Sequence, residues 1–242
     1  NILRPGDNVL AVELHQAAGA PADINMGLGL GALIVTNSPA LAGVLLNEIL
    51  ANNATIEEPD GSKPDWVEIY NPSSNAVDLA DMSLTDDTGN ARRWVFPAGS
   101  VVPAQGFFRV RLNADLPSSN TNAGFGLKAE GGAVYLMNRL ADGGAPASAI
   151  SYGLQAADWS IGRVPDGSTN WMLTIPTLGG PNLVATLGDP AQVKVNEWMA
   201  NPASGADWFE IHNPNPQPVE ISRFWLSDSL EDRKSTRLNS SH

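Results

Sequence analysis

The sequence contains no cysteine, so disulfide bonds and thiolate metal sites are excluded. Histidine occurs only at His15, His212 and His242, and none of the three has partners at a spacing typical of a catalytic triad. A hydrolase mechanism of the serine or cysteine type is therefore not predicted. The lack of cysteine leaves the compartment open, because a reducing interior and a bacterial exterior are both compatible with it.

Basic residues are scarce as well. Lys and Arg total 14 against 26 Asp and Glu, which gives a formal net charge of −12. Such a charge repels nucleic acid and anionic lipid, and Arg92 and Arg93 are the one adjacent basic pair before residue 232. No apolar run approaches the roughly 20 residues that cross a bilayer, since the run at 27–35 ends in a Thr-Asn-Ser-Pro turn. We expect no nucleic-acid partner and no membrane span.

Both ends of the sequence suggest a fragment of a longer protein. The chain opens at Asn1 inside a strand-like pattern, with neither an initiator Met nor a leader peptide. Residues 232–242 resemble the translation of a sequencing adapter, so we exclude them from fold and function and expect them to be irregular.

No helical period of useful length appears, whereas 23 Gly and 18 Pro indicate many turns. Short alternating segments separated by Gly, Pro, Asn and Asp predict an all-β fold. The predicted strands lie near 43–50, 65–70, 77–85, 92–96, 106–112, 125–128, 133–138, 148–152 and 159–163.

One sequence pattern occurs twice. LNEILAN (46–52) recurs as VNEWMAN (195–201), and DWVEIYNP (65–72) recurs as DWFEIHNP (207–214). Copy one has the longer loop between the two motifs, over 54–64. The chain therefore contains two copies of one domain, of which the second is cut off after about three strands.

The alternation within DWVEIY assigns its core face. Val67 and Ile69 lie on one face of the predicted strand, and copy two keeps both positions apolar as Phe209 and Ile211. The opposite face tolerates change, because Tyr70 becomes a histidine in copy two. Val67 therefore points to the core, and strands at this spacing favour two packed antiparallel sheets of the immunoglobulin type.

The repeated polar and aromatic residues form a motif set. Its members are Asn47, Glu48, Asp65, Trp66, Glu68 and Asn71 in copy one, and Asn196, Glu197, Asp207, Trp208, Glu210 and Asn213 in copy two. Paired acids also occur in glycosidases. Strict alternation places Glu48 on the face of Leu46, where it would accept hydrogen bonds from loop amides or the Trp66 indole at the margin of the core. We favour this structural role.

The order of these motifs resembles the bacterial lamin-tail domain. The resemblance is carried by NEIL, DWVEIYNP, VDL, SLTD, WVFPAG, GRVPDG and PTLGGPN, together with the duplication. Leu178 departs from it, since the family often has Pro there. The resemblance implies an immunoglobulin-like β-sandwich, found in repeated copies on secreted and cell-surface proteins, with no catalytic residue.

The resemblance and the repeat divide the chain. Residues 42–183 form a complete lamin-tail domain, 184–191 a linker and 192–231 the start of a second domain. Residues 1–38, with LRPGDNVLAVELHQ and DINMGLGL, resemble the closing strands of a jelly-roll module. Such modules accompany lamin-tail domains in bacterial proteins that also carry kinase-like or hydrolase domains, so the parent protein stays open as an enzyme.

Two acidic loops are candidates for calcium, the one cofactor considered. They offer hard oxygens beside a Gly turn, without the spacing of an EF-hand. Their candidate ligands are Glu57, Glu58, Asp60, Asp86, Asp87 and Asn90. Asp and Gly are common in hairpin turns that bind no metal, so we predict no cofactor.

Two further patterns, a Gly-rich segment and an alternating arginine pair, occur in the sequence. GLGLG (27–31) resembles a phosphate loop, but no helix follows to supply amide groups, so we expect a closing strand. Arg109 and Arg111 alternate with Phe108 and Val110. We expect the two arginines to be solvated or to contact a polyanion.

We predict a non-catalytic structural or adhesive module of a secreted or cell-surface protein. Its partners would be other domains of the same chain and a cell-surface polysaccharide or protein. The alternative is a domain that binds carbohydrate or a polyanion beside an enzyme. Tryptophan exposure separates the two, because a row of solvent-facing indoles favours sugar binding; the indoles concerned are Trp66, Trp94, Trp159 and Trp171.

Overall fold

The structure, a computed structural model, describes residues 43–205, 207–221, 224–226 and 236–237. The predictions for 1–38, including His15 and the GLGLG segment, lie outside the described residues, as does His242. Within the described ranges, no helix is long and apolar enough to span a membrane.

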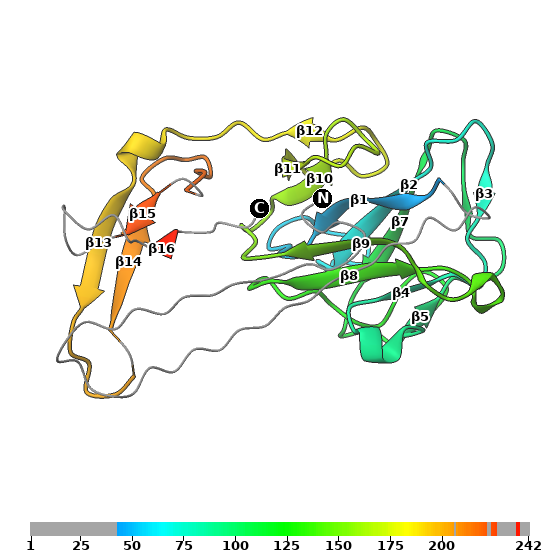
Figure 1. The fold of residues 1–242 in the computed structure, drawn as a ribbon, viewed down its shortest axis with the longest axis horizontal. Helices are drawn as coiled ribbons and strands as arrows, with labels where there is room; N and C mark the ends of the chain where they lie inside the picture. Colours follow the sequence, from blue (N-terminus) through cyan, green and yellow to red (C-terminus); the bar gives the residue numbers. More distant parts are fainter. Residues whose placement is uncertain (1–42, 206, 222–223, 227–235, 238–242) are drawn as a thin grey trace, which may run out of the picture. The chain divides into compact units, whose positions relative to one another are not determined.

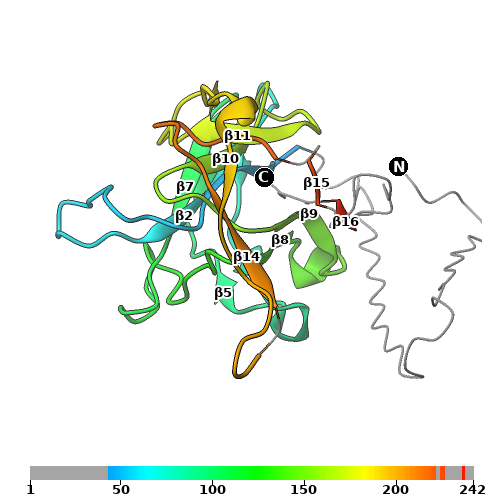
Figure 2. The same ribbon diagram turned by 90° about the vertical axis from the view of Figure 1, so that its left-hand side faces the viewer.

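Copy one is an immunoglobulin-like antiparallel β-sandwich, as the sequence predicts (Figure 1). The larger sheet has six strands in the order β12-β11-β10-β1-β2-β7. Their bounds are Leu183–Val184, Trp171–Ile175, Ser160–Arg163, Leu45–Leu50, Asp65–Tyr70 and Phe107–Leu112. Figure 2 shows β10 and β11 together at one end of this sheet.

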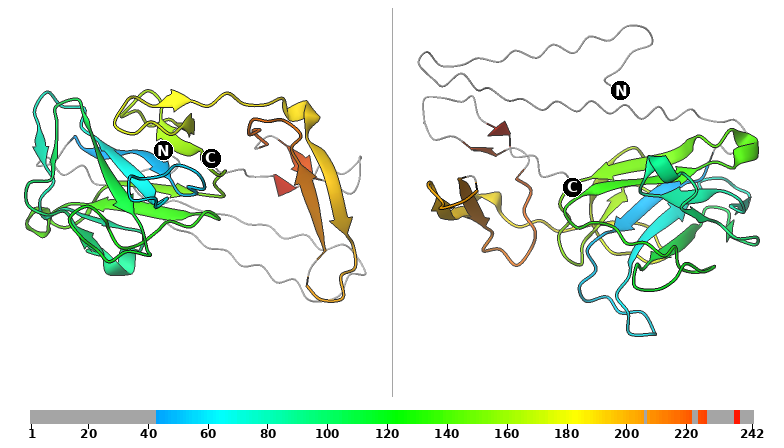
Figure 3. Two further views of the ribbon diagram at one scale, coloured as in Figure 1. Left: turned by 180° about the vertical axis from the view of Figure 1, so that it is seen from behind. Right: turned by 90° about the horizontal axis from the view of Figure 1, so that it is seen from below.

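The second sheet has four strands in the order β5-β4-β8-β9, and a short β3-β6 pair accompanies it. Their bounds are Trp94–Val95, Ser83–Thr85, Gly132–Met137, Pro146–Tyr152, Val77–Asp78 and Val101–Val102. The views from behind and from below show the two sheets as stacked layers (Figure 3). Three short 3₁₀ helices lie among the described residues, at Thr88–Asn90, Leu140–Asp142 and Pro190–Gln192.

The inner faces of the two sheets form one apolar core. Val67 and Ile69 of β2 belong to it and are fully buried, which confirms the predicted face. Leu84, Val134 and Leu136 come from the second sheet. Each large apolar side chain buried in this way contributes roughly 1.5–3 kcal/mol relative to exposure.

The outer face of the larger sheet is also covered, which strand alternation did not predict. Trp66 and Glu68 are 1% and 0% exposed, although they lie on the face opposite Val67. The segment after β11 bonds Glu68 there through Gly179, and the 54–64 loop bonds the arginines of the neighbouring β7. Strand β2 is therefore buried on both faces.

A β-bulge in β1 overturns the predicted face of Glu48. The register between β1 and β2 shifts between Leu46 and Glu48, so Asn47 is the extra residue. Leu46 pairs with Ile69 on the core side, whereas Glu48 pairs with Glu68 on the outer face. The prediction that Glu48 shares the face of Leu46 was wrong, because it assumed an unbroken alternation.

Other differences concern strand limits. The predicted strand 77–85 is two strands, β3 and β4, that belong to different sheets, and 125–128 forms no strand. The sequence pattern missed β6, β11 and β12. β6 and β12 have two residues each, which is too short for a visible alternation, and β11 lies next to the edge strand β12 and is mostly half-buried.

The second repeat begins with the hairpin of β13 (Lys194–Met199) and β14 (Trp208–His212). Its register shifts between Val195 and Glu197, at the position of the bulge in copy one. Every residue of β13 is exposed, with Trp198 at 71% and Val195 at 55%. The strand therefore lacks the covering layers that bury β1.

Residues 232–242 were expected to be irregular, but two of them form a strand. Thr236–Arg237 form β16, which pairs antiparallel with β15 (Trp225–Leu226). Backbone hydrogen bonds make such a ladder, so it needs no particular side chains.

Candidate functional site

The candidate site is a pair of carboxylates beneath the segment that follows β11. Glu48 of β1 and Glu68 of β2 occupy paired positions on adjacent antiparallel strands. Both residues are 0% exposed. Two carboxyl groups on one face of a buried sheet require hydrogen-bond donors, because each would otherwise carry a large desolvation penalty.

Glu48 obtains its donors from β10 and from Thr177. The Ser160 hydroxyl donates to Oε1 at 2.6 Å, and the Thr177 backbone N–H donates to the same oxygen at 3.1 Å. The Thr177 hydroxyl donates to Oε2 at 3.1 Å. Glu48 thereby holds a residue 129 positions away against β1.

Glu68 has fewer partners. The Gly179 backbone N–H donates to Oε2 at 2.7 Å, while Oε1 is buried and has no hydrogen-bond partner among the described residues. Arg109 occupies the paired position on β7 and favours the charged carboxylate, although its guanidinium bonds Glu58 instead.

Burial raises the pKa of both carboxyl groups. Desolvation raises the pKa of Glu48 to about 7, against the opposing effect of the Ser160 and Thr177 hydrogen bonds. Desolvation also raises the pKa of Glu68 to about 8, and the nearby charges of Glu48 and Asp166 add to this. At neutral pH the pair therefore favours at least one proton.

Asn47, the bulge residue, fastens the same region from the other side. Its Nδ2 donates to Asp166 Oδ1 at 2.9 Å, and its Oδ1 accepts the Gly167 N–H at 3.0 Å. Asn182 Nδ2 donates to the carbonyl oxygens of Asn47 and Arg163, both at 3.0 Å. The bulge thus joins the 166–167 turn and the end of the 176–182 segment.

Glycine is required where Asn182 crosses the sheet. A Cβ atom at Gly162 would lie 2.6 Å from Asn182 Nδ2 and 2.7 Å from its Cγ. Gly162 pairs with Glu48, so the close approach lies beside the carboxylate pair. A larger side chain would displace Asn182 from both of its acceptors.

The residues that complete the site were not predicted from the sequence. They are Ser160, Arg163, Thr177, Gly179 and Asn182. Arg163 Nε donates to the Leu46 carbonyl at 2.7 Å, and its guanidinium lies 4.7 Å from the centre of the Trp171 ring. The signal was present, because GRVPDG and PTLGGPN carry four of the five and were used only as marks of the resemblance.

The other motif residues of copy one hold loops. Asp65 accepts the Leu127 N–H at 2.8 Å, and burial raises the pKa of its carboxyl group. Asn71 Nδ2 donates to the Asn75 carbonyl at 2.8 Å. Trp66 is buried, and its indole N–H has no hydrogen-bond partner among the described residues, so the bond to Glu48 considered from the sequence is not formed.

In copy two the motif residues are placed alike but not enclosed. Glu197 pairs with Glu210 across the hairpin, and both are exposed. Asn196 Nδ2 donates to Glu210 Oε1 at 2.6 Å. Asn213 donates to the Gln217 carbonyl at 2.8 Å, repeating the turn of Asn71. Asp207 and Trp208 are exposed.

Four of the six calcium candidates form ion pairs with arginine or lysine side chains. Glu58 contacts Arg109 at 2.5 Å, and Asp60 contacts Arg111 at 2.7 Å. The remaining candidates are also engaged: Asp86 pairs with Arg93, Glu57 with Lys63 at 3.7 Å, Asp87 accepts the Gly89 N–H, and the Asn90 carbonyl accepts the Thr85 hydroxyl.

Calcium would have to displace these partners. Within the described ranges, no group of three or more His, Cys, Asp or Glu is arranged to hold a metal ion. The ion pairs also correct the expectation for Arg109 and Arg111, whose guanidinium groups lie under the 54–64 loop instead of facing solvent alone.

The geometry of the carboxylate pair favours a structural role over a catalytic one. A glycosidase needs both carboxyl groups open to a sugar, whereas Glu48 and Glu68 have no exposed surface. Their hydrogen bonds close the 176–182 segment over the sheet.

Comparisons with known proteins identify a family for part of the chain. A search of curated proteins and a search of solved structures each gave no match. Residues 37–153 match the family model described as the Lamin Tail Domain, which covers β1 to β9, while β10 to β12 continue the larger sheet beyond the match. Residues 37–153 of this chain are therefore a lamin tail domain.

Proposed function

We propose that this domain is a non-catalytic structural or adhesive module that spaces or docks other domains of a multidomain bacterial protein. One observation carries the proposal: the acidic residues of the motif, Glu48 and Glu68, are buried and hold the closing segment. These two carboxyl groups, the residues most suggestive of catalysis, therefore stabilise the fold. The repeat of the same motif in β13 and β14 fits a chain of similar modules.

The proposed location is extracellular or at the cell surface. It rests on the repeated bacterial lamin-tail domains that the sequence resembles. Other domains of the same chain are the proposed partners, together with a cell-surface polysaccharide or protein. A net charge of −12 disfavours nucleic acid as a partner.

The alternative function is carbohydrate binding beside an enzyme. In copy one Trp66 and Trp94 are 1% and 5% exposed, and Arg163 covers Trp171. Copy two presents Trp198 at 71% and Trp208 at 44% exposure on one hairpin. A sugar site, if the alternative holds, therefore belongs to β13 and β14.

A polysaccharide array probed with the full chain tests the proposal. We expect no saturable binding above that of Trp198→Ala, because a scaffold needs no open aromatic platform. Saturable binding that Trp198→Ala abolishes would favour the carbohydrate alternative. Ester, phosphate and glycoside substrates should give no turnover, and turnover that is lost in Glu48→Gln or Glu68→Gln would overturn the non-catalytic assignment.

A further inference from the structure

β7, an edge strand of the larger sheet, has backbone groups that are not paired with another described strand. β7 is the last strand in the order of that sheet, and β2 pairs with only one side of it. On the other side the Arg111 carbonyl accepts the Ala123 N–H at 3.0 Å, in a parallel bridge between Arg111 and Asn122. The short 121–123 segment thus already pairs with one end of this edge.

The free part of the edge lies next to Arg109. Backbone groups of alternate residues point to opposite sides of a strand, so Arg109 directs its N–H and C=O outward as Arg111 does. No described residue bonds these two groups. An unpaired edge of this kind is a template for an added strand.

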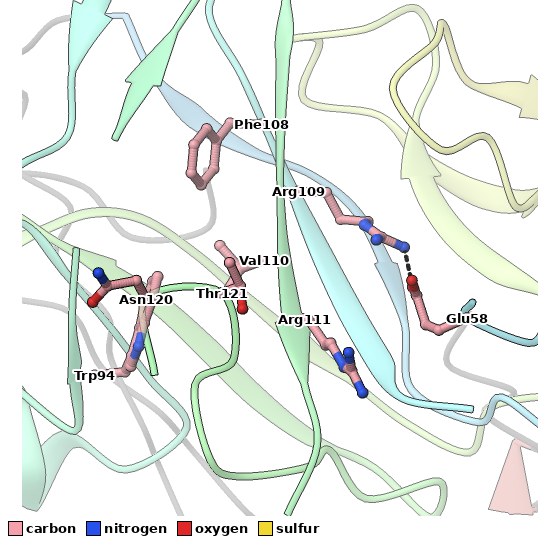
Figure 4. Close-up of a pocket in the computed structure, with 8 residues that line it drawn as sticks. All are labelled: Glu58, Trp94, Phe108, Arg109, Val110, Arg111, Asn120 and Thr121. Carbon is pink, nitrogen blue, oxygen red and sulfur yellow. Dashed lines mark hydrogen bonds and ion pairs between the residues drawn. The ribbon is translucent and has the colours of Figure 1, made fainter. Parts of the chain in front are cut away.

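A cavity of about 310 Å³ opens beside this edge (Figure 4). Its inner wall is apolar, formed by Trp94 of β5 with Phe108 and Val110 of β7. Asn120 and Thr121 supply polar groups at its other wall. The volume suits one or two aliphatic side chains of a bound chain.

The two arginines lie on the opposite side of β7 from the apolar wall, as Figure 4 shows. Glu58 bonds one nitrogen of Arg109, Nη1, at 2.5 Å. Arg111 Nη2 bonds Asp60 and Ser62. The Arg109 and Arg111 side chains are 31% and 17% exposed. Each guanidinium has five N–H donors, so donors on the terminal nitrogens are left for a further carboxylate.

We propose that the β7 edge binds an extended peptide in which acidic and aliphatic side chains alternate. The peptide would add a strand beside Arg109, with its aliphatic side chains in the cavity and its acidic ones next to Arg109 and Arg111. Side chains on neighbouring strands share a face, so this alternation matches the two sides of β7. The inference deepens the proposed docking role and rests on it.

Fluorescence anisotropy with the full chain and a labelled EVEVEV peptide tests the proposal. We expect saturable binding, weakened at least tenfold in Arg109→Ala and in Arg111→Ala. Arg139→Ala is the matched control, since Arg139 bonds the Asp78 and Ala80 carbonyls and does not line the cavity, and it should leave the affinity unchanged. Thermal melts establish that each variant is folded.

Three further peptides and heparin distinguish strand addition at the β7 edge from other modes of binding. The peptide N-methylated at alternate amides should lose binding, because strand addition needs its backbone donors. KVKVKV should bind at least tenfold more weakly, and ESESES should also bind more weakly because it leaves the cavity empty. Equal binding of the methylated or the basic peptide would overturn the proposal. So would a chain that binds heparin through Arg109 and Arg111 but does not bind EVEVEV.

The two proposals fail differently. A lack of peptide binding removes the β7 edge as a docking site and leaves the scaffold role intact. Sugar binding or turnover removes the scaffold role and leaves the peptide result unchanged.

Discussion

Glu48 and Glu68 face each other on adjacent strands, and each accepts a backbone N–H from the segment that closes over them. Thr177 and Gly179 provide these N–H groups. The sheet therefore contains two buried acids whose hydrogen bonds hold a segment distant in the sequence. The same pair makes the stability of the domain depend on pH.

We predict that the free energy of unfolding falls as pH rises from 4.5 to about 8. The pKa of Glu48 is raised to about 7 and that of Glu68 to about 8, so the folded state retains protons that the unfolded chain releases. The loss is on the order of 1 kcal/mol per pH unit for each carboxyl that titrates in this window. Urea denaturation at several pH values measures it.

Glu68→Gln should flatten this pH profile. The amide keeps an oxygen for the Gly179 N–H and removes one of the two titrating groups. Glu57→Gln is the control for the loss of a carboxyl group elsewhere, because the Glu57 side chain is 63% exposed and lies outside the Glu48–Glu68 pair. A wild-type profile that is level or rises between pH 4.5 and 8 would contradict the prediction.

Val67→Asp should unfold copy one, whereas Tyr70→His should be tolerated. Val67 is fully buried in the core, where an aspartate finds no partner for its charge. Tyr70 is partly exposed and packs on Phe107, with ring centres 5.0 Å apart, so its replacement should cost about 1 kcal/mol. Circular dichroism melts test both, and a stable Val67→Asp protein would show that the core face is misassigned.

Gly162→Ala should destabilise copy one by about 1–3 kcal/mol, because its methyl group would collide with Asn182. Asn182→Ala should also destabilise, through loss of the bonds to Asn47 and Arg163. In the double variant the collision is gone, so the combined loss should be smaller than the sum of the single losses. If thermal or urea denaturation shows additive losses, the destabilisation by Gly162→Ala does not come from contact with Asn182.

Limited proteolysis should remove the second repeat before the first. The β13–β14 hairpin exposes apolar residues such as Val195 and Trp198, whereas β1 and β2 are buried. Segments with little buried apolar surface open at low free energy and are cut first. Mass spectrometry should find a resistant fragment that ends between residues 184 and 191. Equal resistance on both sides of 184–191 would contradict the prediction.

The repeated motif is visible in the sequence alone. Strand alternation determined the fold class and the core face of β2. These follow from backbone geometry, since the side chains of a strand alternate with a period of two wherever one face is buried. The alternation of Val67 and Ile69, repeated at Phe209 and Ile211, was sufficient for that face.

The position of the Glu48–Glu68 pair on the outer face of the sheet depends on tertiary structure. One extra residue at Asn47 turned Glu48 from the core face to the outer face, and a bulge leaves no mark in a pattern of apolar residues. Likewise, only the folded chain joined Glu48 to Thr177, and Arg109 to Glu58. Strand alternation is local and can be predicted from the sequence, whereas partners brought together by loops and register depend on the packing of the whole domain.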